Sequence, residues 1–307
     1  MDIFIQQIIN GLVLGSIYAL VALGYTMVYG IMGLINFAHG EVVMIGAMVA
    51  LTVIKLLAAS GLPVYLVVLI ALIAATAMCM AVGYSIERIA YRPLRRAPKL
   101  APLITAIGVS IVLQNLAMLI WGRNYHAFPP ILPTAQFDIL GATITTVQVA
   151  IVLIAALLMA VLIALIDHTR LGRAMRATSE NPPIAQLMGV NINQIISLTF
   201  IIGSALAAVA GLMVSANYSI AHYYMGFMLG LKAFTAAVLG GIGNIAGAVL
   251  GGLLLGLIES LGAGYIGDLT GGFLGSNYQD IFAFFVLIGV LVFRPSGLIG
   301  ERVSERA

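Results

Sequence analysis

Residues 64–86 form an uncharged and almost wholly apolar stretch that is long enough to cross a lipid bilayer as a helix. Similar stretches recur along the whole chain of 307 residues, of which 62% are hydrophobic and 8% are charged. An ordinary soluble domain carries about 25% charged residues. No soluble core of this size hides so much apolar surface, so the sequence predicts a polytopic membrane protein.

The apolar stretches are continuous and do not alternate with period two, which favours helices over the strands of a membrane barrel. We predict an all-α bundle of about eight to ten transmembrane helices, about nine being the best count, in one domain over residues 1–307. The lone Cys79 is expected to pack inside a span. The expected spans are 8–29, 33–57, 64–86, 100–121, 145–166, 196–217, 227–243, 246–264 and 279–294.

Basic residues gather in two loops, at 87–99 and 167–176, and in the tail from 294. The positive-inside rule places all three on the cytoplasmic side. The loops at 122–143 and 262–280 carry few or no basic residues and are expected outside, and counting back places the N-terminus outside as well.

The sequence holds no Gly-Lys-Ser or Gly-Lys-Thr, no Gly-x-Ser-x-Gly and no His/Cys cluster with metal spacing. We therefore expect no enzymatic activity, cofactor or metal. The ionisable candidates for positions inside the bilayer are His39, Glu41, Lys232 and Glu259, with Glu259 expected at the interface near a helix end.

The loop that begins with the second basic cluster continues beyond residue 176 and contains the signals of a short helix over about 182–188. Asn181 is a good N-cap, Pro182 suits the first helical position and Gly189 suits the position after the C-cap. A two-turn helix is marginal alone, so we interpret it as a docking element for a cytoplasmic subunit. A solvated helix resting on its own bundle is the alternative. The docking residues would be Asn181, Pro182, Ile184, Ala185, Leu187, Met188 and Gly189.

A polar cluster interrupts the second apolar stretch at Asn36, His39 and Glu41. Three readings stay open: residues that line a transport pathway, a cytoplasmic hairpin, and a discontinuous helix. Residues 33–38 (GLINFA) and 241–246 (GIGNIA) share Gly, Asn and Ala at one spacing, as in a weak internal repeat with two central breaks. The pathway candidates are Asn36, Phe37, His39, Glu41 and Asn244.

Four stretches carry a resemblance to a known family: GYTMVYGIMGLINFAHGEVVMIGA (24–47), residues 85–115, KAFTAAVLGGIGNIAGAVLGGLLLGLIE (232–259) and RPSGLIG (294–300). They resemble the LivH-type permeases of branched-chain amino-acid ABC importers. The family's coupling loop has Glu-Ala-Ala, three residues, then Gly. Here Ala185 and Gly189 match that pattern, while Pro183 and Ile184 depart from it.

The resemblance implies a permease subunit of the bacterial inner membrane without its own ATPase site, coupled to ATPases through a loop at about 167–195. Its partners would be a second related permease, two cytoplasmic ATPases and a periplasmic amino-acid-binding protein, with no nucleic acid. Leucine, isoleucine and valine are the expected cargo. Urea, short amides or other amino acids are the alternative cargo, and an ion-coupled secondary carrier working alone is the alternative class.

Overall fold

Small residues set the architecture, because they let the first helix pack backbone against backbone on a helix near the C-terminus. In a computed structural model of the chain, α1 (Asp2–Met32) lies along α10 (Ile245–Leu269) for much of its length. A Cβ atom on Gly15 would lie 2.7 Å from the Cα of Leu253, and one on Gly252 would lie 2.5 Å from the Cα of Ala19. Such close approach is typical of helices in a bilayer, where packing drives association.

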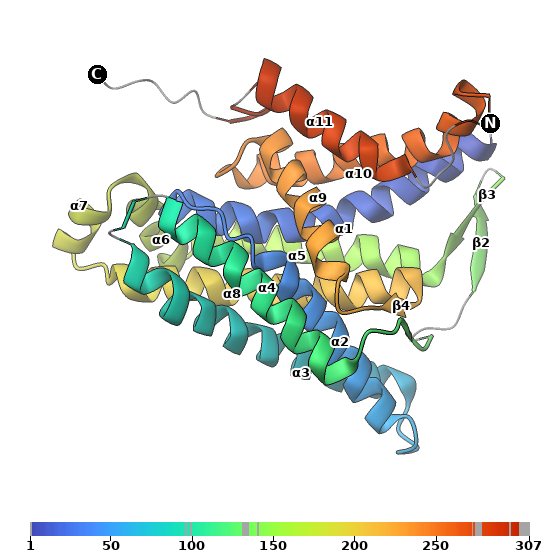
Figure 1. The fold of residues 1–307 in the computed structure, drawn as a ribbon, viewed down its shortest axis with the longest axis horizontal. Coiled ribbons are helices and arrows are strands. Elements are labelled where there is room, and N and C mark those ends of the chain that lie inside the picture. The colour runs from blue at the N-terminus through green and yellow to red at the C-terminus, as the bar shows by residue number, and fades with distance from the viewer. Residues whose placement is uncertain are drawn as a thin grey trace.

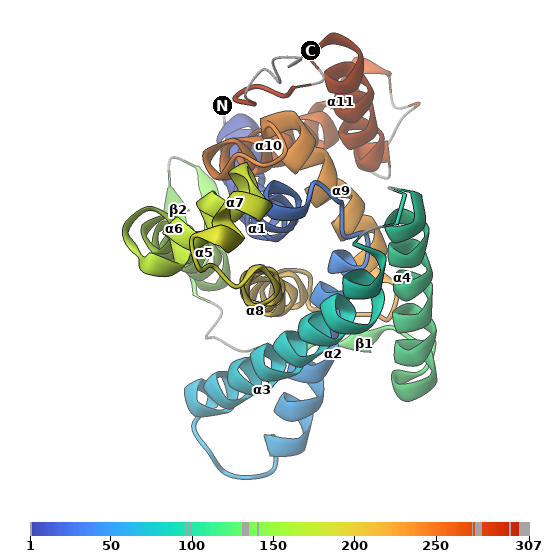
Figure 2. The same ribbon diagram turned by 90° about the vertical axis from the view of Figure 1, so that its left-hand side faces the viewer.

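The structure describes residues 2–95, 97–98, 100–130, 135–139, 141–271, 273, 278–294 and 296–300. Five helices form the inner part of the bundle: α1, α10, α2 (His39–Leu57), α8 (Ile192–Tyr218) and α9 (Met225–Gly240). Viewed along the bundle, Figure 2 shows α1 among α8, α9 and α10. The remaining helical elements are α3 (Val64–Ser85), a π-helical turn (Ile86–Tyr91), a 3₁₀ turn (Arg92–Leu94), α4 (Leu100–Trp121), α5 (Thr146–His168), α6 (Arg170–Glu180), α7 (Pro182–Leu187) and α11 (Gln279–Phe293).

Four short strands form two antiparallel pairs outside the helices. β1 (His126–Ala127) pairs with β4 (Ile220–Ala221), and β2 (Gln136–Ile139) pairs with β3 (Ala142–Thr145). Neither pair closes into a barrel in the described part of the chain. The prediction of an all-α membrane bundle is therefore confirmed.

Every predicted span coincides with a helix, but the helices differ in length from the prediction. Within the described residues, seven helices are long and apolar enough to cross a membrane, whereas α9 has 16 residues and α11 has 15. Sixteen residues rise about 24 Å, less than the roughly 30 Å of bilayer hydrocarbon. The second predicted span also begins later than expected, at His39 rather than at residue 33.

The elements sort into two ends. Figure 1 shows α6 and α7 at one end and the β2–β3 hairpin beside the start of α1 at the other. At the first end, Arg95 donates to Asn193 at 2.5 Å, which joins the first basic loop to the start of α8. At the other end, Gln6 donates to the carbonyl oxygen of Thr143 at 3.0 Å. This grouping matches the topology expected from the charges, and we call the end with α6 and α7 the coupling end.

Candidate functional site

The polar cluster lies at a break between two helices, where Gly33 is exposed and Asn36 and His39 are buried. The first helix ends at Met32, and Gly33 then adopts a positive φ of 62°, a conformation that favours glycine. Asn36 is 3% exposed, and its Oδ1 accepts hydrogen bonds of 3.2 Å from the backbone N–H of Ala38 and from the hydroxyl of Tyr91. The Asn36 side chain is therefore held inside the protein at the point where α1 ends and α2 begins, an arrangement consistent with a discontinuous helix.

The histidine that begins α2 is enclosed by its neighbours. Its side chain occupies the space left open by Gly24, which has no Cβ, and its ring lies edge-on to Tyr25 with centroids 5.0 Å apart. Its Nε2 has no hydrogen-bond partner among the described residues. A buried polar atom without a partner costs free energy, so His39 stays a candidate for a functional role.

Glu41 connects α2 to the peripheral helix α4. The carboxylate is 1% exposed, and its Oε1 accepts from Gln114 Nε2 at 2.6 Å and from Ser110 Oγ at 3.1 Å. Its Oε2 has no partner within the described chain. An acidic group inside a membrane is costly and is usually functional. Gln114 thus bonds to a neighbouring helix.

The two proposed breaks differ in their surroundings. Phe37 is half-buried and packs against Phe234, with ring centroids 5.6 Å apart. Asn244 lies in a partly exposed turn, where its Oδ1 caps α10 by accepting from Gly247 N at 2.9 Å and its Nδ2 donates to the carbonyl of Ile299. Both segments are thus breaks between consecutive helices, α1–α2 and α9–α10, but Asn36 is buried whereas Asn244 is partly exposed.

The short helix predicted in the second basic loop is confirmed as α7. Asn181 Oδ1 accepts from Ile184 N at 3.1 Å, and Gly189 has a φ of 88°. Leu187 is 86% exposed, and Ala185 is buried against its own chain. The exposed apolar side chains of this segment, the coupling face, are Ile184, Leu187 and Met188.

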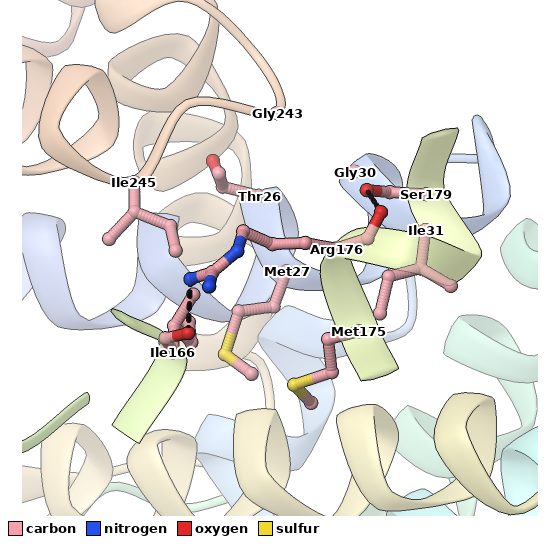
Figure 3. A pocket seen from close by; sticks show the side chains of 10 residues that line it. All are labelled: Thr26, Met27, Gly30, Ile31, Ile166, Met175, Arg176, Ser179, Gly243 and Ile245. Atoms are coloured by element: carbon pink, nitrogen blue, oxygen red, sulfur yellow. Dashed lines mark hydrogen bonds between the residues drawn. The ribbon is translucent and has the colours of Figure 1, made fainter. Parts of the chain in front are cut away.

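A helix that the sequence analysis missed, α6, connects α7 to the rest of the bundle. Thr169 caps it by accepting from Gly172 N at 3.1 Å. Figure 3 shows Met175 and Arg176 of α6 beside the last turns of α1, where a cavity of about 110 Å³ lies. Arg176 donates to the carbonyl of Ile166. The other residues that line the cavity are Thr26, Met27, Gly30, Ile31, Ser179, Gly243 and Ile245. α6 therefore touches the end of α1 just before the buried break.

A buried glutamate ties the first basic loop to α8. Glu87 is fully buried, accepts from Arg92 at 3.1 Å and Ser197 Oγ at 2.7 Å, and also pairs with Arg95. Burial lowers the pKa of the Arg95 guanidinium, and the adjacent Glu87 opposes that shift. In the sequence, Glu87 directly follows the predicted span 64–86. The basic residues five and eight positions later were the available signal.

The expectation that Glu259 lies at the interface near a helix end was wrong. Glu259 is fully buried within α10 rather than interfacial, and its Oε1 lies 2.6 Å from Lys232 Nζ. Sequence reasoning missed this pair because its members are far apart in the chain and are brought together by the α9–α10 packing. Among the described residues, no group of three or more His, Cys, Asp or Glu side chains is placed to hold a metal.

Fold and site together define a multi-pass helical membrane protein whose polar groups cluster at a helix break and at the end of the bundle that carries α6 and α7. The family model described as "Branched-chain amino acid transport system / permease component" matches residues 7–291. The chain belongs to this family, and it is a permease component of the inner membrane.

Curated relatives match over nearly the full length. The permease protein BraD of Pseudomonas aeruginosa, of a high-affinity branched-chain amino acid transport system, is 49% identical over 99% of this chain and 98% of its own. The corresponding protein LivH of Escherichia coli is 45% identical over 99% and 97%. The ribose import permease protein RbsC of Escherichia coli is 29% identical over 94% and 85%.

Proposed function

We propose that this chain is the permease subunit of an ATP-driven importer that carries leucine, isoleucine and valine across the inner membrane. The observation that carries the proposal is the near full-length similarity to BraD and LivH, whose names specify branched-chain amino acid transport. The sequence has no nucleotide-binding loop. The energy would therefore come from separate ATPase subunits.

The coupling face supplies the contact for those subunits. Ile184 and Leu187 of the six-residue helix α7, and Met188 directly after it, are exposed apolar side chains that a partner would cover, which would stabilise the helix. We assign residues 167–195 as the coupling segment of a single permease domain, 1–307. One ATPase would dock on α7 of this chain and a second on a related permease subunit, with a periplasmic binding protein at the opposite end, near His222, Tyr223 and Tyr224.

The geometry offers a route from the coupling face to the membrane centre. Movement of α7 passes to α6, and Met175 and Arg176 of α6 lie against the last turns of α1. Those turns lead into the non-helical break at 33–38, in which Asn36 and Ala38 are buried. We therefore propose that Asn36, Phe37, His39 and Glu41 line or control the pathway. Asn244, in the turn that leads into α10, would contribute to the pathway at the coupling end.

The test is uptake of labelled leucine by proteoliposomes that contain the whole complex, in competition with unlabelled compounds. Isoleucine and valine should compete, whereas urea, acetamide and ribose should not. Strong competition by urea or acetamide would instead support the alternative cargo. If neither group competes and leucine does not accumulate, the assignment to branched-chain amino acids is wrong.

A further inference from the structure

A second polar cluster lies apart from the break and beside a cavity. Lys232 of α9 lies 2.6 Å from Glu259 of α10 and 2.6 Å from Asp280 at the start of α11. Tyr18 in the middle of α1 donates to Glu259 at 2.9 Å. Lys232 Nζ also lies 3.4 Å from the Tyr18 hydroxyl. Four helices therefore contribute to one charged cluster.

The cluster forms one wall of a cavity of about 420 Å³ between α1, α8, α9 and α11, which we call the Lys232 cavity. Pockets for small molecules have volumes of about 300–1,000 Å³ and combine apolar walls with a few polar groups. Much of the wall is apolar, with Ile17, Met228 and Leu229 among its residues. Tyr125 and Tyr224, which are 72% and 43% exposed, lie where the cavity opens.

The charges of the cluster do not balance. Two carboxylates, Glu259 and Asp280, share the single ammonium group of Lys232, and no other Lys or Arg of the described residues pairs with either. The Glu259 side chain is fully buried, whereas the Asp280 side chain is 39% exposed and lines the cavity. The cavity thus presents a carboxylate in excess next to an ammonium group.

We propose that the Lys232 cavity binds the free amino acid during transport, an inference that rests on the proposed function. Asp280 receives the α-ammonium group, Lys232 receives the α-carboxylate, and the apolar wall receives the aliphatic side chain. The zwitterion inserts between Lys232 and Asp280, so one ion pair is exchanged for two charge-assisted pairs and the net charge of the cluster is unchanged. Glu259 and Tyr18 hold Lys232 in place as positioning residues.

The first experiment measures leucine uptake by the reconstituted complex with Asp280→Asn, which keeps the size of the side chain and removes its charge. We expect the KM for leucine to rise at least tenfold. Asp138→Asn on the exposed β2 strand is the matched control and should transport as the unsubstituted complex does. An unchanged KM in Asp280→Asn would overturn the proposal and leave the cluster as an ion pair that only holds α9, α10 and α11 together.

A second measurement keeps the proposal testable if that variant does not assemble. Binding of labelled leucine to the solubilised unsubstituted complex, without the binding protein, is challenged with leucinol and with 4-methylpentanoate. Each analogue lacks one charged group, so each should compete at least tenfold more weakly than leucine. If both analogues competed as strongly as unlabelled leucine, the zwitterion site would be overturned. A complex that takes up no leucine at all contradicts the proposed function instead, so the two failures are distinguishable.

Discussion

At the scale of single residues, the start of α2 depends on glycine at position 40. A Cβ there would lie 2.9 Å from the Cα of Gly230 and in collision with the carbonyl of Gly226, both on α9. Gly40→Ala should therefore destabilise the protein by about 1–3 kcal/mol through overpacking. The measurement is the thermal unfolding midpoint of the purified protein in detergent.

Gly108→Ala on α4 is the matched control, because no atom lies within 4 Å of the added methyl group. Alanine favours a helix over glycine by about 0.5–1 kcal/mol, so this variant should be neutral or slightly more stable. Equal midpoints for the two variants would contradict the close contact between α2 and α9.

The carboxylate of Glu87 should matter more than its position at a helix end indicates. Glu87→Gln leaves two guanidinium groups facing a neutral amide. We expect the free energy of unfolding to fall by about 2–3 kcal/mol, less than the roughly 3–5 kcal/mol that is typical when one partner of a fully buried ion pair is removed. The side chains of Arg92 and Arg95 keep 30% and 18% exposure, which moderates the loss. Chemical denaturation of this variant is compared with that of Glu180→Gln, whose exposed side chain makes it a neutral control. A smaller loss in Glu87→Gln than in the control would contradict the network.

Sequence reasoning works at this scale where the interaction is local. The Asn181 cap and the positive φ of Gly189 were predictable because caps and turns are set by a few neighbouring residues. The Lys232–Glu259 pair and the Glu41–Gln114 bond were not, because each joins helices whose adjacency no local pattern encodes.

At the scale of elements, α7 is the part of the chain most exposed to a partner. Leu187→Asp should fold normally, since its side chain is 86% exposed, but it should weaken ATPase association by about tenfold or more. The measurement is the Kd between the solubilised permease and the purified ATPase. Leu62→Asp, in the α2–α3 loop, is a control with an exposed leucine outside the coupling segment. Similar affinities for the two variants would rule out α7 as the docking element.

The elements also show why an apolar run predicts that a helix exists better than it predicts where that helix ends. Residues 33–38 are apolar enough to extend a helix, yet Gly33 and the Asn36 side chain end one helix and begin the next. The helix α6 was missed because its charged sequence, RLGRAMRATSE, reads as a solvated loop. Its stability comes from packing on α1 and α5, which a sequence window does not contain.

At the scale of the whole molecule, the three features to which we assign functions lie in different parts of the bundle. Figure 1 shows α7, which carries most of the coupling face, at one end. Asn36, His39 and Glu41 are buried where α1 gives way to α2, and the Lys232 cavity is lined by residues of α1, α8, α9 and α11. Such an arrangement suits a subunit that is moved by its partners.

The measurement that tests this account most directly is accumulation of labelled leucine in proteoliposomes, with this chain alone and with the complete complex. We predict accumulation only when the second permease, the ATPases, the loaded binding protein and ATP are all present. Collapse of proton and sodium gradients should leave that uptake unchanged. Accumulation by this chain alone, driven by a proton or sodium gradient without ATPases, would contradict the account.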